Sequence, residues 1–271
     1  MSHLLEQPDL VDRFLAGYAN RRWRGFISLR RLLRRPAIRF RTRHGAVFTL
    51  RPEDYIDRIV LQAGFYESEV HEALRPYFAP GVVLWDIGAN IGLHSISAAL
   101  AEPAMSVHSF EPNPAVFSRL ADHARQNGTA VRCRSVALGD HDGSVTLHLN
   151  NSGNPGMTTI TPWSEARYDA QIQVPLARAD TLIARGVLPA PNLIKLDVEG
   201  GEAAVLDGFG QQLSQPGLHA VVFETRADLL ADPTRCPAAS RLRAAGFQFR
   251  ALNREEDSAH ALGNFIATRQ P

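Results

Sequence analysis

Short apolar runs alternate with turns and helical segments along most of the chain after residue 81. The pattern predicts strands at 82–87, 106–110, 130–138, 193–198 and 219–224. Helices are predicted between or after them, at 93–101, 114–127, 201–209 and 237–245. Such alternation is typical of right-handed βαβ units, whose parallel strands form a sheet that helices cover on both faces.

Two segments depart from this alternation. Strands are predicted at 143–149 and 170–176, and the polar stretch between them contains glycine and proline, which predict an irregular loop. The length of this loop makes it a candidate lid over a site. Further on, "FQFRAL" and "GNFIAT" flank a polar turn and predict an antiparallel hairpin at the edge of the sheet.

The first part of the chain is basic. The segment 20–43 holds ten arginines and no acidic residue, interleaved with large apolar side chains. It predicts a helix that ends at Pro36, then a hairpin, then a helical segment at 52–77. We interpret the arginine-rich helix as a solvated cover, with peripheral contact to anionic lipid or an acidic substrate as the alternative. The predicted domains are an extension at 1–80 and an α/β domain at 81–271 with an insertion at about 143–177.

Composition argues against several classes of protein. The net charge of +1 argues against nucleic-acid binding, and the two distant cysteines match no disulfide framework or zinc spacing. No apolar run reaches about 18 residues and no signal peptide is recognised, so a cytoplasmic location is expected. The oligomeric state stays open, with a dimer as one alternative.

A glycine-containing turn follows the first core strand. It reads "WDIGANIGLH" and places Asp86, Gly88, Asn90 and Gly92 before a helix. The spacing differs from the dinucleotide motif GxGxxG, because Asn stands at position 90. An acid before the glycines disfavours a phosphate there, so a nucleoside without a pyrophosphate fits better. Glu111 ends the next strand 23 residues beyond Gly88 and is a candidate for binding both hydroxyls of a ribose.

The stretch "NLIKLDVEGGE" (192–202) contains the only lysine of the chain. Lys195 and Asp197 alternate along a strand and should point to the same side, where a buried ammonium needs a carboxylate partner. We expect Lys195 to pair with Asp197 or Glu199 and to keep that acid ionised. Either acid is a candidate base for a hydroxyl proton or a candidate ligand of a divalent cation, which would make the metal site Asp197 and Glu199. Glu202, at the start of the following helix, is interpreted as structural, through the helix dipole or a buried hydrogen bond.

Several stretches together are similar to the FkbM-type family of S-adenosylmethionine-dependent methyltransferases. They are "FYESE" (65–69), "VVLWDIGANIGLHS" (82–95), "FEPNP" (110–114), "VALGDHDGSVTL" (136–147), "LIKLDVEGGEAAVLDGF" (193–209) and "VVFE" (221–224). The resemblance implies a class I methyltransferase (Rossmann-like) fold. This fold is a seven-stranded, mostly parallel sheet with a C-terminal antiparallel hairpin, here preceded by the helical and hairpin extension.

The resemblance also implies the cofactor, S-adenosylmethionine, and its contacts. Tyr66 and Glu67 are expected at the mouth of the cofactor site. The turn is expected near the methionine part, Glu111 near the ribose and 135–137 near the adenine. The full set of expected cofactor residues is Tyr66, Glu67, Asp86, Gly88, Ala89, Asn90, Gly92, Glu111, Pro112, Asn113, Ser135, Val136, Ala137 and Asp197.

The leading hypothesis is O-methylation of a hydroxyl on a small molecule or glycan in natural-product or polysaccharide biosynthesis. Asp197, Glu199 and Lys195 are the candidate catalytic residues, and His94, Asn154, Thr158 and Trp163 the candidate acceptor-binding residues. The alternatives are N-methylation within the same family, a nucleotide-dependent oxidoreductase, which the glycine spacing disfavours, and a non-catalytic binding protein on this fold. The sequence does not select the acceptor, and it leaves a divalent cation open.

Overall fold

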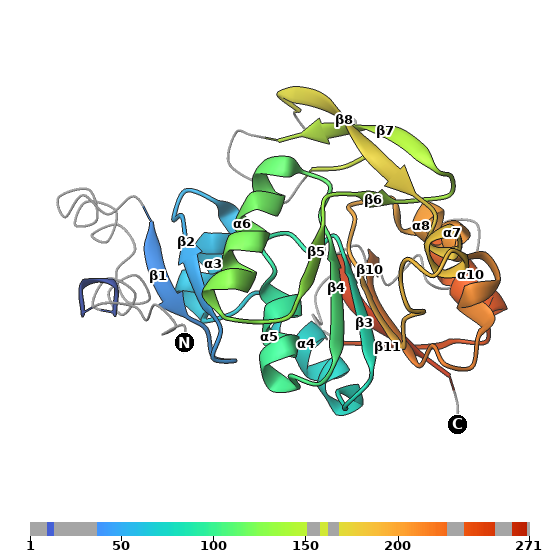
Figure 1. Cartoon of the computed structure of the whole chain (residues 1–271), viewed down its shortest axis with the longest axis horizontal. Helices are drawn as coiled ribbons and strands as arrows, with labels where there is room; N and C mark the ends of the chain where they lie inside the picture. Colours follow the sequence, from blue (N-terminus) through green and yellow to red (C-terminus); the bar gives the residue numbers. More distant parts are fainter. Residues whose placement is uncertain are drawn as a thin grey trace.

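The computed structural model describes residues 10–13, 37–150, 158–161, 168–226, 236–252 and 262–269. A seven-stranded sheet with the order β11-β12-β10-β9-β3-β4-β5 lies at the centre of this part of the chain (Figure 1). Its strands, in chain order, are β3 (Val83–Ile87), β4 (Ser106–Phe110), β5 (Arg132–Arg134), β9 (Leu193–Leu196), β10 (Ala220–Arg226), β11 (Gln248–Ala251) and β12 (Leu262–Thr268). Strands β10, β9, β3, β4 and β5 are parallel to one another, and β12 runs antiparallel to both β10 and β11. The mostly parallel sheet with an antiparallel C-terminal hairpin is therefore confirmed.

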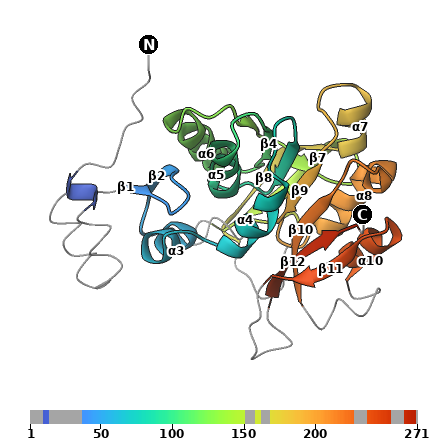
Figure 2. The same ribbon diagram turned by 90° about the horizontal axis from the view of Figure 1, so that it is seen from below.

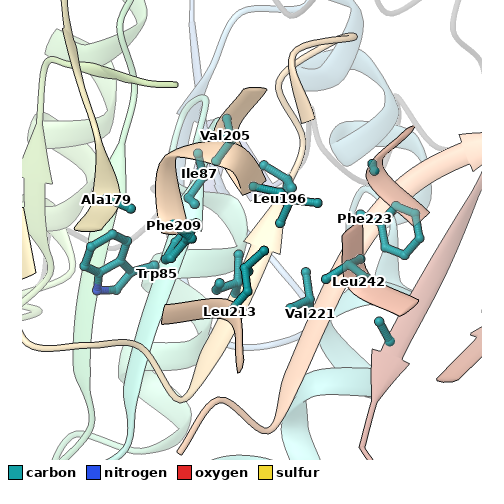
Figure 3. Packing of buried hydrophobic residues seen from close by; sticks show 14 of the residues in the cluster. Trp85, Ile87, Ala179, Leu196, Val205, Phe209, Leu213, Val221, Phe223 and Leu242 are labelled. Atoms are coloured by element: carbon teal, nitrogen blue, oxygen red, sulfur yellow. The ribbon is translucent and has the colours of Figure 1, made fainter. Parts of the chain in front are cut away.

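Helices cover both faces of this sheet (Figures 1 and 2). One layer contains α4 (Ser68–Leu74), α5 (Leu93–Ala101) and α6 (Pro114–Gln126), and the other contains α7 (Ala179–Ala184), α8 (Glu202–Phe209) and α10 (Pro237–Ala244). On the second face, Trp85, Phe209 and Phe223 are buried among aliphatic side chains from the strands and from α8 and α10 (Figure 3). Burial of this apolar surface on both faces fixes the strand ends where a site can form.

The helical segment predicted at 52–77 is broken, so a single helix there is wrong. Helix α3 (Tyr55–Ala63) ends at Gly64, whose φ of 86° is left-handed, and α4 begins after Glu67, whose φ is 50°. A short 3₁₀ turn (Arg75–Tyr77) follows α4. The reversal between the helices brings Tyr66 and Glu67 to the wall of a pocket instead of leaving them on a helix surface.

The strand predicted at 130–138 is also wrong as a single element. The chain leaves the central sheet after β5, and β6 (Ala137–Leu138) joins a second sheet with the order β6-β8-β7. That sheet contains β7 (Gly143–Leu149) and β8 (Ala170–Ala177), which pair antiparallel, so both strands of the predicted insertion are present. Between β5 and β6 the backbone turns away from the sheet, and Val136 lines the pocket.

The hairpin predicted after the arginine-rich segment is present, as β1 (Ile38–Arg41) and β2 (Val47–Leu50). Side chains of α6 hold it and α3 in place. Asn127 forms two hydrogen bonds of 2.7 Å with the backbone of Val47, and Arg119 forms ion pairs with Asp54 and Asp57. The predicted helix before Pro36 lies outside the described residues, and the division at residue 80 stays a prediction.

Candidate functional site

Lys195 lies at the centre of the sheet, on β9 between β3 and β10, with Asp86 as its register partner on β3. Only 5% of the residue is exposed. Its ammonium donates to Asp197 Oδ2 at 2.9 Å and to the carbonyl of Gly88 at 3.1 Å, and it lies 3.7 Å from Asp86 Oδ1. Burial lowers the pKa of Lys195, but the nearby carboxylates, Asp197 foremost, outweigh it and keep that pKa above its usual value. The lysine therefore stays charged and joins the ends of β3 and β9.

Asp86 lies beneath the glycine turn and outside the residues that line the pocket. Its Oδ2 accepts hydrogen bonds from the backbone N–H and the hydroxyl of Ser95 in α5. Its Oδ1 has no hydrogen-bond partner in the described part of the chain, although Lys195 is near. Burial raises the pKa of Asp86, and Lys195 counteracts this. The arrangement favours a structural role for Asp86, which anchors the turn from below.

The two glycines of the turn are required by the packing of the protein itself. Gly88 has a φ of 77°, and a Cβ at this position would lie 1.7 Å from the carbonyl oxygen of Asp197. Gly92 has a φ of 88°, and a Cβ there would lie 2.5 Å from Leu120 of α6. The close approach at both glycines is therefore between parts of the protein itself. It allows the turns after β3 and β9 to meet.

A pocket of about 250 Å³ opens above these turns, at the carboxyl ends of the parallel strands. Among the expected residues it is lined by Tyr66, Glu67, Gly88, Asn90, Glu111, Pro112, Val136, Ala137, Thr158, Asp197 and Glu199. Some of the lining residues follow β3 and β4, and others follow β9 or lie in β10. The sequence-based set therefore converges on one cavity, although its members are spread over more than 130 positions of the chain.

One end of the pocket fits a nucleoside. Glu111 is held in the wall because its two carboxylate oxygens accept hydrogen bonds from the backbone N–H groups of Asn90, at 3.0 Å, and Asn113, at 2.8 Å. Each oxygen keeps a further lone pair that a ribose hydroxyl can use. Burial raises the pKa of Glu111 to about 7. Beside it, Phe110, Val136, Ala137 and Leu138 supply an apolar wall for a flat ring.

The other end of the pocket is lined by four carboxylates, which belong to Glu67, Asp197, Glu199 and Glu224. Burial, followed by the negative charge of Asp197, raises the pKa of Glu199 and of Glu224 to about 8 each. It raises the pKa of Glu67 as well. In the described chain, the non-glycine residues with left-handed φ are Glu67 (50°), Asn90 (49°) and Glu199 (57°), and all three line this pocket. Backbone strain of this kind gathers at functional sites.

Several expected residues lie near the pocket without lining it. These are Asp86, Ala89, Gly92, His94, Asn113, Ser135 and Lys195. Asn113 caps α6, and Ala89 donates its N–H to the carbonyl of Phe110. The ring of His94 packs edge-on against Phe65 at a centroid distance of 5.5 Å, and both of its nitrogens lack partners in the described structure. Burial lowers the pKa of His94, which favours packing over contact with an acceptor. Asn154 and Trp163 lie outside the described residues.

Sequence reasoning missed two pocket residues that the structure makes prominent. The hydroxyl of Thr159 donates to the carbonyl of Glu199 at 2.7 Å, so this part of the candidate lid is fastened to the turn after β9. Glu224 lies in β10, at the end of the stretch "VVFE", and lines the pocket. The rule that drew attention to Asp197, an acid at the end of a core strand, could have found Glu224. No comparable signal marks Thr159.

Two further observations concern the turn after β9 and a metal. Glu202 accepts hydrogen bonds of 3.2 Å from the N–H groups of Val198 and Gly200, which fasten the turn after β9 to the start of α8. Within the described residues, no group of three or more histidine, cysteine or acidic side chains is placed to hold a metal ion. A cation held by Asp197 and Glu199 therefore stays a prediction.

The sheet order, the turn after β3, the acid after β4 and the shared pocket together define a class I methyltransferase that uses S-adenosylmethionine. The chain belongs to the FkbM methyltransferase family, because the family model described as "Methyltransferase FkbM domain" matches residues 86–235. The sequence-based predictions of family, enzyme class and cofactor are confirmed. No helix among the described residues is long and apolar enough to cross a membrane.

Three relatives show how far the similarity extends. The hexuronic acid methyltransferase AglP of Haloferax volcanii is 29% identical over 239 residues, which cover 87% of this chain and 93% of that protein. The 31-O-demethyl-FK506 methyltransferase FkbM of Streptomyces tacrolimicus is 29% identical over 172 residues, 54% of this chain and 65% of that protein. The 2-O-methyltransferase NoeI of Sinorhizobium fredii is 27% identical over 151 residues, 50% and 60% of the two chains.

Proposed function

We propose that this enzyme methylates a hydroxyl group of a sugar or a related small molecule. The observation that carries the proposal is the division of one pocket into a nucleoside end at Glu111 and an acidic end at the tips of β9 and β10. The names of the relatives support it, since one acts on a hexuronic acid and two are named for methylation at an oxygen. Bound S-adenosylmethionine supplies a methyl group activated by its sulfonium sulfur.

The nucleoside end is proposed to bind the cofactor through Glu111. Its carboxylate is fixed by two backbone donors, so it meets a ribose diol without loss of side-chain freedom. Asn90 and Gly88 are proposed to line the methionine part, next to Asp197, and Val136 to Ala137 the adenine. Tyr66 and Glu67, which also line the pocket, are proposed to lie at the mouth of the cofactor site.

At the acidic end, Asp197 is proposed to orient the acceptor hydroxyl. The ion pair with Lys195 holds the carboxylate at the pocket wall, and a fixed hydrogen-bond acceptor can align the hydroxyl oxygen with the methyl carbon. Lys195 lies behind Asp197 and is proposed to position it. Glu199 stands on the same turn, tied to the candidate lid through Thr159, and is proposed to contact the acceptor when the lid is in place.

Calorimetry and transfer assays test the proposal together. Binding of S-adenosylmethionine or S-adenosylhomocysteine, without binding of NAD, is expected. Radiolabelled methyl transfer to a panel of sugars and alcohols is expected to label some of them, while matched amines test N-methylation. Binding of NAD alone would support an oxidoreductase, and cofactor binding without transfer to any hydroxyl would contradict the proposal.

The variant Glu111→Gln tests the nucleoside end of the pocket separately from the acidic end. Hydrogen bonds to a charged group contribute about 1.5–3 kcal/mol, so the affinity for S-adenosylhomocysteine is expected to fall roughly 10- to 100-fold. Asp122→Asn is the matched control, because Asp122 forms an exposed ion pair with Arg125 on α6. It should bind the cofactor like the parent enzyme. An unchanged affinity in Glu111→Gln would contradict the assignment of the ribose site.

A further inference from the structure

Glu224 lies in β10 (Ala220–Arg226), one position beyond Phe223, which forms the last register pair of β10 and β9 with Leu196. Asp197 directly follows β9, so the two acids occupy corresponding positions where β9 stops and β10 continues. Both line the pocket. On its other side, Glu224 is the register partner of Asn264 in β12. Glu224 is thus placed on a rigid element at the acceptor end of the site.

Two other carboxylates of the pocket are engaged by a donor or a cation. Asp197 is paired with Lys195, and Glu111 accepts two backbone hydrogen bonds. Such contacts stabilise the ionised form and make a carboxylate a weaker base.

No hydrogen bond or ion pair to the side chain of Glu224 or Glu199 is found in the described part of the chain. Glu224 differs from Glu199 and Glu67 in its backbone, because it lies in a strand between β9 and β12, whereas Glu67 and Glu199 have left-handed φ in turns. Burial and the carboxylates of Asp197, Glu67 and Glu199 raise the pKa of Glu224 to about 8. A half-buried carboxylate among like charges is stabilised when it takes up a proton, because burial and the neighbouring charges disfavour its ionised form. A base is most effective when its pKa lies near the working pH, and this group meets that condition.

We propose that Glu224 is the general base that accepts the proton of the acceptor hydroxyl. The inference rests on the proposed function, because it assumes a hydroxyl acceptor. As the acceptor oxygen forms its bond to the methyl carbon, its O–H bond breaks and the proton moves to the Glu224 carboxylate. The bond between the methyl carbon and sulfur breaks at the same time, and its electron pair stays on sulfur. Asp197, already paired with Lys195, orients the hydroxyl without taking the proton.

The variants Glu224→Gln and Glu224→Asp test this role in the full-length enzyme. Glu224→Gln is expected to bind S-adenosylhomocysteine like the parent and to lose at least about 100-fold in kcat, the usual contribution of general base catalysis. In the parent enzyme kcat/KM is expected to rise with pH through about 8, and this limb should be absent in Glu224→Gln. Glu224→Asp keeps a carboxylate and should recover part of kcat. Asp122→Asn serves again as the matched control.

Two results would overturn the proposal. One is a Glu224→Gln enzyme whose kcat stays within about threefold of the parent, and the other is an equal loss of kcat and of cofactor affinity, which would indicate a structural role. A carboxyl titration that needs no acceptor gives an independent check. In ¹³C-glutamate spectra of the S-adenosylhomocysteine complex, the signal that disappears in Glu224→Gln should titrate near pH 8. Titration at the ordinary value of 4.5 would overturn the proposal even if no acceptor were found for the parent enzyme.

Discussion

At the scale of single residues, the site depends on one buried cation between two acids. Lys195→Met would leave Asp86, which is 1% exposed, and Asp197 without their positive partner. Breaking a buried ion pair from one side costs about 3–5 kcal/mol, so the free energy of unfolding should fall by that order. Chemical denaturation monitored by circular dichroism measures the loss.

The matched control for this change is Arg241→Met. Arg241 pairs with Asp207 in a partly exposed position, and such pairs contribute at most about 1 kcal/mol. Lys195→Arg is the sharper comparison, because a planar guanidinium does not fit where a compact ammonium meets Asp197, the Gly88 carbonyl and Asp86. If Lys195→Arg kept full activity and stability, the geometric argument would be wrong.

Alternation along a strand predicted that Lys195 and Asp197 share a side, and the ion pair between them is local in sequence. Thr159 could not be predicted in the same way, since its partner Glu199 is 40 positions distant and the contact depends on the path of the chain. The same holds for Glu67, whose place in the pocket requires a left-handed residue between two helices. Local periodicity carries no information on either contact.

At the scale of elements, Gly208 determines how closely α8 approaches the second sheet. A Cβ at this position would lie 2.0 Å from the carbonyl oxygen of Gly139, which belongs to rigid backbone. Alanine ordinarily stabilises a helix by about 1 kcal/mol relative to glycine. Here we expect Gly208→Ala to destabilise the protein, because overpacking costs about 1–3 kcal/mol. Thermal unfolding measures the change.

Gly217→Ala is the control for that prediction. Its nearest contact to an added Cβ would be Asn192 Nδ2 at 3.8 Å, an ordinary van der Waals distance. The melting temperature of Gly217→Ala should therefore stay close to that of the parent. A Gly208→Ala protein as stable as the parent would show that α8 can move away from the second sheet at little cost.

The elements that the sequence predicts best are those whose ends coincide with a change in hydrophobic pattern, such as β4 and α5. The prediction failed at 130–138, where apolar residues recur on both sides of the point at which the chain passes from one sheet to another. It failed again at 52–77, where helical composition hides the left-handed Gly64 and Glu67. In both cases tertiary packing, which local propensity does not contain, decides the outcome.

At the scale of the whole molecule, stability should depend on pH in a defined window. Burial raises the pKa of Glu199 and Glu224 from 4.5 to about 8, so each binds a proton more tightly in the folded state. The stability that these acids contribute in their protonated form is lost as the pH rises from 4.5 to 8. Burial lowers the pKa of His71 and His123 from 6.5 to about 4, so stability from these bases is gained between pH 4 and 6.5.

Below pH 6.5 the acids Glu199 and Glu224 and the histidines His71 and His123 change the stability in opposite directions. Above pH 6.5 the contribution of these histidines is complete, while that of the two acids is still being lost. The melting temperature should therefore fall between pH 6.5 and 8, as measured by calorimetry at constant ionic strength. Glu199→Gln removes one of these carboxylates and should make the slope in that interval smaller. A melting temperature that is constant or rises from pH 6.5 to 8 would contradict the assignment.

The parallel alternation and the family resemblance together predict the class of sheet. Alternating strands and helices predict two helical layers, but the order β5-β4-β3-β9-β10-β12-β11 cannot be derived from periodicity, because strands adjacent in the chain need not be neighbours in space. The resemblance implied a seven-stranded, mostly parallel sheet with an antiparallel hairpin, and the structure gives the order of its strands. The resemblance also directed attention to the ends of β3 and β9, where the pocket lies.

The burial of Lys195 has a consequence for the chemical reactivity of the surface. Since this is the single lysine of the chain and only 5% of it is exposed, the folded protein presents almost no ε-amino group to solvent. Reagents that acylate lysine side chains can reach it only when the ends of β3 and β9 separate. The rate at which Lys195 is acylated therefore measures how often the ends of β3 and β9 separate. A bound cofactor that holds these ends together would slow the labelling.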